Sequence, residues 1–174
     1  FGSRPLSGYD LAVIFIDGKT FSGDQMVIAL GVDVHGKKIP LGFVQTATEN
    51  ATVCKEFLRG LLQRGLKVDQ GILFVIDGAK GLSKAIEEVF SGCGLIQRCQ
   101  WHKRENVVSY LPKETQAGFR RKLQQAYEKP TYPEAKAALG HIAKELKLVN
   151  ESAVHSLNEG LEETLTLHRL GLFP

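Results

Sequence analysis

Two aspartates, sixty residues apart, each follow a run of apolar residues and precede a glycine. Residues 11–16 (LAVIFI) lead into Asp17, and residues 73–76 (LFVI) lead into Asp77. Such short runs, rich in β-branched residues, are typical of buried strands, so each carboxylate is expected where its strand ends. If the strands are neighbours, the pKa of one carboxyl rises unless a cation neutralises the pair. Mg²⁺ and Mn²⁺ prefer oxygen ligands, and the pair therefore predicts a divalent metal site.

Each Asp-Gly step also has a purely structural interpretation. Asp and Gly are both common where a strand gives way to a turn, because Asp bonds to the backbone that follows it and Gly adopts conformations that other residues avoid. The two interpretations differ in whether the strands must be neighbours. The order of the other elements bears on that question.

The first hundred residues predict strands and helices in a definite order. Residues 26–34 and 39–45 are two further strands joined at the turn His35-Gly36-Lys37, and with residues 11–16 they form an antiparallel meander. Residues 48–64 are expected to be a helix with Thr48 as its N-cap and Gly65 after its end. A strand at 72–76, a helix at 79–90 and a short strand at 95–97 follow.

The remaining residues, from His102 onward, have a helical pattern with interruptions at Pro112, Pro130 and Pro133. The fold class is therefore α/β, with a mixed sheet followed by an all-helical segment. In such a sheet the first and fourth strands can lie side by side in the middle. Asp17 and Asp77 would then emerge at neighbouring strand ends.

The composition is that of a globular protein with one domain, or one domain and an insertion. The chain has 174 residues, 43% of them hydrophobic, and a formal net charge of +3. It contains no apolar run of about 18 residues, so no membrane partner is expected. Three irregularly spaced cysteines do not form a disulfide framework, which indicates a reducing cytosol. Residues 101–131 carry seven Lys/Arg against three acidic residues, which favours either a polyanionic partner or a solvated helix face.

Four segments of the sequence form a recognisable pattern: LAVIFIDGKTF, LGVDVHGKKIPLGFVQTATENATVCKEFL, LFVIDGAKGLSKAIEEVF and QRCQWHKRENV. In this order they resemble the bacterial Mutator-type insertion-sequence transposases, and the resemblance extends from about residue 4 to residue 174. It implies an RNase H-like catalytic core over residues 1–111 and a helical insertion over residues 112–174. It also implies an Asp-Asp-Glu triad that binds Mg²⁺ or Mn²⁺, with Asp17 and Asp77 as the two aspartates.

The family's Cys-x-x-His motif falls on Cys99 and His102, beside the expected site. The third acid of the triad is expected beyond residue 174, so none of the late glutamates (Glu159, Glu162, Glu163) is assigned to it. The chain is thus expected to be a fragment that folds but does not cleave or transfer strands alone. In the parent transposase the chemistry would be phosphodiester hydrolysis at the element's end, followed by attack of the freed 3′-hydroxyl on target DNA.

Several other side chains near these motifs are candidates for binding. A zinc site at Cys99 and His102 is disfavoured because no second ligand pair is present. The segment GAKGLSK lacks the spacing of a phosphate-binding loop. Trp101 is expected to be a core anchor, or, if exposed, to stack on a base. The candidates for DNA contacts are basic: Lys80, Lys103, Arg104, Arg120, Arg121 and Lys122.

The expected partners are the DNA of the element's ends and of the target, with self-association on that DNA, in the bacterial cytoplasm at the nucleoid. Two other functions remain open from the sequence. The chain could be a non-catalytic DNA-binding or assembly remnant of a transposase. A more distant alternative is an RNase H-like nuclease with another substrate.

Overall fold

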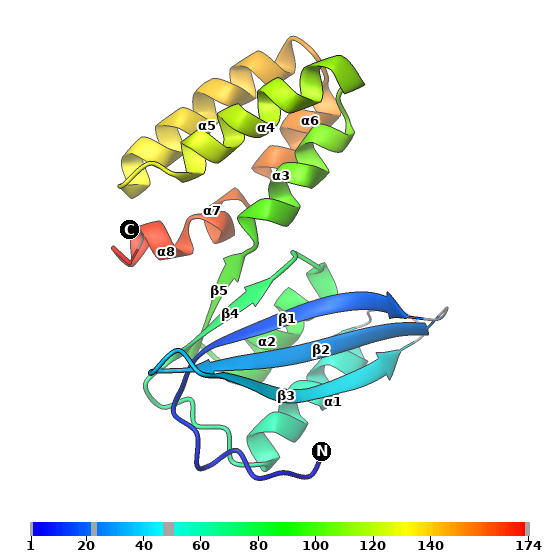
Figure 1. The fold of residues 1–174 in the computed structure, drawn as a ribbon, viewed down its shortest axis with the longest axis vertical. Helices are drawn as coiled ribbons and strands as arrows, with labels where there is room; N and C mark the ends of the chain where they lie inside the picture. Colours follow the sequence, from blue (N-terminus) through cyan, green and yellow to red (C-terminus); the bar gives the residue numbers. More distant parts are fainter. Residues whose placement is uncertain (1, 22–23, 47–50, 173–174) are drawn as a thin grey trace. The chain divides into compact units, whose positions relative to one another are not determined.

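The computed structural model describes residues 2–21, 24–46 and 51–172. Its contacts divide the chain into two compact units, residues 1–96 and residues 97–174 (Figure 1). The expected division into a catalytic core and an insertion, with its boundary after residue 111, stays a prediction. The expected N-cap Thr48 lies outside the described residues. No helix in the described ranges is long and apolar enough to cross a membrane.

The first unit begins with an antiparallel meander, as predicted: β1 (Leu11–Phe21), β2 (Asp24–Asp33) and β3 (Lys38–Thr46). The turn between β2 and β3 is held by the carboxylate of Asp33, whose Oδ1 accepts the backbone N–H groups of His35 and Lys37. The expected end of the first strand is wrong. β1 continues past Asp17 to Phe21, because its backbone stays paired with β2 as far as Asp24.

β4 (Ile72–Ile76) lies parallel to β1, and β5 (Gly94–Arg98) is next to it. The strand order is β3-β2-β1-β4-β5, so β1 occupies the middle of a five-stranded sheet with β4 beside it (Figure 1). The sheet is mixed, since β1 pairs antiparallel with β2 and parallel with β4. The α/β fold class and the adjacency of the first and fourth strands are therefore confirmed.

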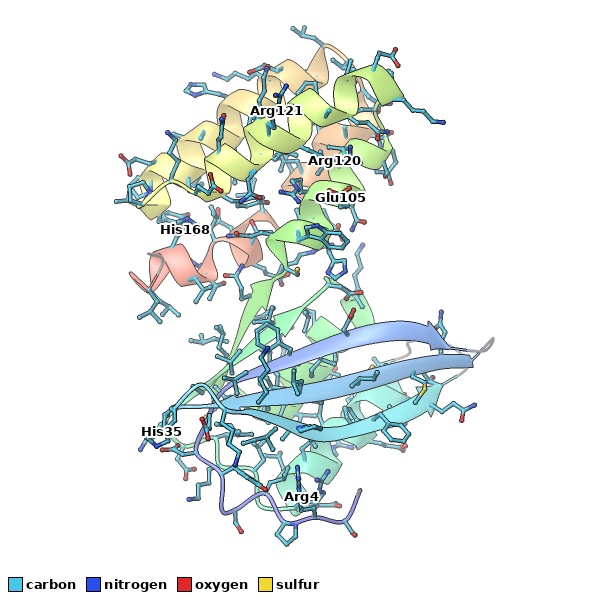
Figure 2. All side chains as sticks on the ribbon, viewed as in Figure 1. Arg4, His35, Glu105, Arg120, Arg121 and His168 are labelled. Atoms are coloured by element: carbon cyan, nitrogen blue, oxygen red, sulfur yellow. The ribbon has the colours of Figure 1, made fainter. Side chains whose placement is uncertain are left out.

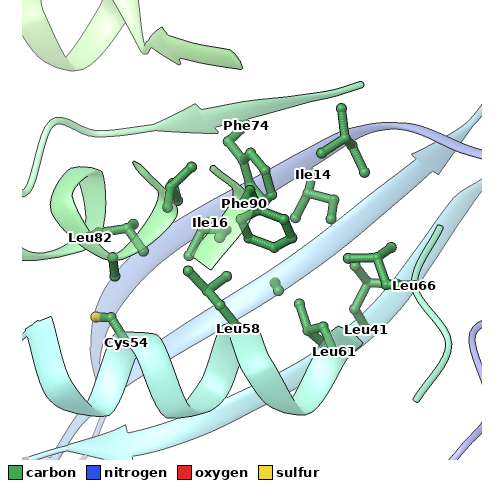
Figure 3. Packing of buried hydrophobic residues seen from close by; sticks show 14 of the residues in the cluster. Ile14, Ile16, Leu41, Cys54, Leu58, Leu61, Leu66, Phe74, Leu82 and Phe90 are labelled. Atoms are coloured by element: carbon green, nitrogen blue, oxygen red, sulfur yellow. The ribbon is translucent and has the colours of Figure 1, made fainter. Parts of the chain in front are cut away.

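Helices α1 (Ala51–Gln63) and α2 (Lys80–Phe90) pack on one face of this sheet. Ile14 and Ile16 of β1 and Phe74 of β4 are fully or almost fully buried there, in one cluster with Leu58 of α1 and Phe90 of α2 (Figure 3). Successive side chains of a strand point to opposite faces. The alternate residues accordingly face away from the helices, and three large ones stay partly exposed: Phe15 at 43%, Ile28 at 41% and Phe43 at 57%.

The second unit is helical after β5. Its helices are α3 (Gln100–Ser109), α4 (Lys113–Tyr127), α5 (Tyr132–Lys147), α6 (Glu151–Asn158), α7 (Leu161–Thr164) and α8 (Thr166–Arg169). Their buried residues form a separate core that includes Val107, Leu123, Leu139, Leu157 and Leu165.

The predicted start of the helical segment is two residues late, because α3 begins at Gln100. Pro112 precedes α4 and Pro130 lies between α4 and α5, as expected. Pro133 interrupts nothing: it lies in the first turn of α5, where a missing backbone N–H costs no hydrogen bond. Two side-chain caps begin the later helices, Thr131 at α5 and Asn150 at α6.

Candidate active site

Asp17 and Asp77 occupy corresponding positions on two neighbouring parallel strands. The pairing of β1 with β4 runs from Val13 opposite Leu73 to Ile16 opposite Ile76. The residue that follows Ile16 is Asp17, still within β1, and the residue that follows Ile76 is Asp77, just after β4. Neighbouring strands lie about 4.8 Å apart, so the backbones at the two aspartates are adjacent.

The sheet directs Asp17 away from its helix-covered face. Ile16 and Ile76 are each 1% exposed and point toward α1 and α2. Because side chains alternate, Asp17 belongs to the open face, on the same side as Phe15 and directly across from Ile28 of β2. Asp77 is the first residue after β4, where the backbone begins to turn. Both aspartates are partly buried.

The chain turns sharply just after Asp77. Its Oδ1 accepts the backbone N–H of Ala79 at 3.1 Å, and Gly78 has a φ of 106°, which is strained for any residue with a side chain. This turn leads into α2, which begins at the exposed candidate Lys80. Gly18 differs, because it lies within β1, paired with Val27. The turn interpretation therefore holds in part at Asp77 and fails at Asp17.

The Cys-x-x-His residues lie in the second unit, at the start of α3. Cys99 is the residue before the helix, and the ring of His102 meets that of Trp101 edge-on, with the centroids 4.8 Å apart. The Nδ1 atom of His102 is buried without a hydrogen-bond partner in the described part of the chain. The expectation that Trp101 anchors the core is wrong, since its side chain is 57% exposed. The nearness of Cys99 and His102 to the two aspartates stays a prediction.

Lys103 does not serve as the surface contact that the sequence suggested. It is 1% exposed, and its ammonium donates to the backbone carbonyls of Ser156 and Glu159 at the end of α6, at 2.6 and 2.5 Å. Burial, together with the nearby Arg98 guanidinium, lowers the pKa of Lys103 to about 8. Its ammonium is therefore bonded to the end of α6, and Lys103 is not exposed for contact with DNA.

Arg98 completes a buried cluster that the sequence analysis missed. Its guanidinium donates to the backbone carbonyl of Glu159 at 3.1 Å and to the carboxylate of the same residue at 3.2 Å. The Glu159 carboxylate also lies 3.7 Å from the Lys103 ammonium. One signal could have indicated that Lys103 is buried: it lies one turn before Val107 on α3, and Val107 is fully buried.

The late glutamates are engaged inside the second unit. Glu159 neutralises the buried cations just described, and Glu162 accepts from Lys136 and from the Tyr132 hydroxyl, each at 2.8 Å. The hydrogen bond from Lys136, followed by that from Tyr132, lowers the pKa of the Glu162 carboxyl. Within the described ranges, no three His, Cys, Asp or Glu residues form a group that could hold a metal ion.

Three of the candidate DNA contacts gather in one place. Arg104 of α3 and Arg120 and Arg121 of α4 line the same groove, whereas Lys122 pairs with Glu145 of α5 and lies over the ring of Phe119. Of the five candidates between residues 101 and 131, Lys103 is thus buried, Lys122 is paired with α5, and the three arginines lie together.

The comparisons with known proteins identify a family for this chain. The chain matches the family described as "Transposase, Mutator family" over residues 1–171. It is 27% identical to the transposase for insertion sequence element IS6120 from Mycolicibacterium smegmatis, over 97% of this chain and 53% of that protein. It is 31% identical to the transposase for ISRM5 from Rhizobium meliloti, over 83% of this chain and 36% of that protein.

A third relative, the transposase for IST2 from Acidithiobacillus ferrooxidans, is 29% identical over 82% of this chain and 48% of its own length. The chain spans only about a third to a half of the curated relatives that it matches. The family match, in contrast, covers nearly every residue of the chain. The chain belongs to the Mutator family of transposases.

Proposed function

We propose that this chain carries the catalytic domain of a DNA transposase, with an RNase H-like fold, in which Asp17 and Asp77 bind a divalent metal. One observation carries the proposal. Asp17 and Asp77 directly follow Ile16 and Ile76, which are paired with each other on adjacent central strands and are buried on the face that α1 and α2 cover. The strand order, with an antiparallel meander and a parallel fourth strand beside β1, supports the RNase H-like assignment.

The residues present fit a hard cation in part. Asp17 and Asp77 supply carboxylate oxygens, the ligands that Mg²⁺ and Mn²⁺ prefer. Glu159 and Glu162 are paired with cations of the helical unit. When bound, the metal would activate the attacking oxygen and stabilise the leaving one.

In this proposal the chain also positions the DNA substrate next to the two aspartates. Gly78 turns the backbone away directly after Asp77, and without a side chain it lets a phosphodiester approach the carboxylates closely. Asp17 lies within β1, where it is paired with Ile28 of β2, and the residue before it, Ile16, is paired with Ile76 of β4. The proposed substrates are the element's ends and the target DNA, with strand cleavage followed by attack of the 3′-hydroxyl. Self-association on DNA belongs to this proposal.

Metal binding by the 174-residue chain tests the proposal directly. Mn²⁺ would be titrated into the protein and the free ion followed by electron paramagnetic resonance. Asp17→Asn and Asp77→Asn keep the side-chain shape but remove the charge, and each should weaken Mn²⁺ binding at least about tenfold, because a hard cation loses an anionic ligand.

Asp10 and Asp69 provide a matched control. They precede the same two strands, β1 and β4, at the opposite end, where they line one pocket. Asp10→Asn and Asp69→Asn should leave Mn²⁺ binding unchanged. Equal losses in both pairs of variants would mean that the ion binds diffusely to acidic surface. Unchanged binding in Asp17→Asn and Asp77→Asn would overturn the metal site and favour a non-catalytic DNA-binding remnant.

A further inference from the structure

We infer that the groove between α3 and α4 in the helical unit binds the phosphodiester backbone of DNA. The inference rests on the proposed function, since it takes DNA as the partner. The groove has a volume of about 350 Å³ and is lined by Arg104, Arg120, Arg121, Gln124, Gln125 and Glu128. We call this set the arginine groove. Figure 2 shows Arg120 and Arg121 on α4, with Glu105 on the adjoining α3.

Two of the three arginines are held in place by one carboxylate. Arg120 donates through Nε to both carboxylate oxygens of Glu105, at 3.0 and 3.2 Å, and through Nη2 to Gln116. Arg104 donates through Nε to Glu105 at 3.4 Å and through Nη1 to the side chain of Gln124. Because a guanidinium has five N–H donors, each retains donors for a ligand. Fixed guanidinium groups lose less side-chain entropy when they bind.

Arg121 supplies the charge that is not neutralised. It is exposed, and it has neither a hydrogen-bond nor an ion-pair partner among the residues that the structure describes. The acidic residue that lines the groove, Glu128, accepts a hydrogen bond from Gln124 at 2.7 Å. The three guanidinium groups thus face one carboxylate in the groove, Glu128, and one beside it, Glu105, which leaves a net positive charge and an excess of donors.

The chemistry of the arginine groove fits phosphate groups better than it fits bases. Guanidinium groups bind phosphate oxygens in a bidentate manner, and glutamine amides also donate to the phosphate and sugar backbone. Contacts of this kind position DNA without reading its sequence. The groove should therefore bind duplex DNA with little sequence preference and with a steep dependence on salt.

The dependence of DNA affinity on salt concentration indicates how many phosphate groups the arginine groove contacts. Each phosphate neutralised contributes about −0.9 to the slope of log affinity against log salt concentration. Three arginines then predict a slope of about −2.7, which corresponds to a loss of about 40-fold in affinity between about 50 and about 200 mM salt. Arg121→Ala should reduce this loss to about 12-fold, and Arg104→Ala with Arg121→Ala to about 3.5-fold.

The experiment is fluorescence anisotropy of a labelled DNA duplex titrated with the 174-residue chain, in buffer with EDTA. Lys144→Ala with Lys147→Ala is the control, because it removes two exposed charges from α5 that do not line the groove. It should leave the slope at its original value. Arg121→Ala alone keeps the test valid if the double variant unfolds, since Arg121 has no structural partner to lose.

A slope that changes equally in the groove variant and the control would overturn the inference, as would a slope unaffected by both. EDTA removes the metal, so these outcomes are independent of Asp17 and Asp77. Loss of the Mn²⁺ site with an intact groove would instead remove the proposed catalytic function alone.

Discussion

Raising the pH from 7 to 10 should stabilise the helical unit through Lys103. Burial and the neighbouring Arg98 guanidinium lower the pKa of this lysine from 10.5 to about 8 in the folded chain. At pH 7 Lys103 is protonated in both the folded and the unfolded chain, so burial of its charge lowers the free energy of unfolding by the full amount. Above pH 8 the folded lysine loses its proton while the unfolded one retains it up to pH 10.5, and stability rises wherever the unfolded state binds more protons.

The magnitude follows from the two pKa values. Each tenfold difference in proton affinity is worth about 1.4 kcal/mol, so the cost at neutral pH is about 3 kcal/mol. Most of it is relieved by pH 10, and the free energy of unfolding should rise by about 2.5 kcal/mol from this group. Burial raises the pKa of Tyr127 from 10.0 to about 12, so its phenol stays protonated in the folded chain. In the unfolded chain the same phenol begins to ionise near pH 10, which opposes the rise in stability equally in the wild type and in the variant used below.

Urea unfolding at pH 7 and at pH 10 measures this change, followed by the fluorescence of Trp101. Trp101 is the protein's single tryptophan and lies in the helical unit. Lys103→Met is the matched variant, because it keeps the length of the side chain and removes the titrating group. Other groups titrate in both proteins, so the difference between wild type and variant isolates Lys103. If that difference stays constant within about 0.5 kcal/mol between the two pH values, Lys103 is not desolvated as the structure indicates.

Three substitutions test the packing of the two units by urea unfolding. Gly160→Ala should destabilise the helical unit by about 2–4 kcal/mol, because Gly160 has a φ of 62° and an added Cβ would overlap the Arg98 guanidinium; a change below about 0.5 kcal/mol would contradict this. Asn150→Ala should cost about 1–2 kcal/mol, since Asn150 caps α6 and also donates to the Tyr110 carbonyl; Asn150→Asp should keep the cap. Leu58→Ala should cost about 2–5 kcal/mol in the first unit while Trp101 still reports an unchanged helical unit.

Much of the sheet was predictable because its signals are local. Short β-branched runs bounded by turn residues identify strands, and a meander followed by strand–helix–strand units leaves few arrangements of the sheet. The end of β1 was not predictable in this way. The segment from Asp17 to Phe21 becomes a strand through backbone pairing with β2, which the polar side chains in it do not indicate.

In the candidate site, too, some residues are indicated by local sequence patterns and others are brought together only by the fold. Asp17 and Asp77 were identified because each follows a conspicuous apolar run, and the adjacency of their strands follows from topology. The Arg98–Lys103–Glu159 cluster joins residues that are 56 and 61 positions apart in the chain, so no local pattern could show it. Trp101 was misjudged because tryptophan is usually well buried, and only the packing around α3 shows that its ring stays outside.

The shared register of β1 and β4 has a consequence for how the family can vary. Because Asp17 and Asp77 are aligned by strand pairing, the loops and helix between them can gain or lose residues without changing their relative position. A single-residue deletion inside either strand, in contrast, would change which face of the sheet its side chains occupy. It would turn every later side chain to the opposite face and carry one aspartate into the apolar core beneath the sheet. Natural length variation in this lineage should therefore be concentrated between the strands and absent within them.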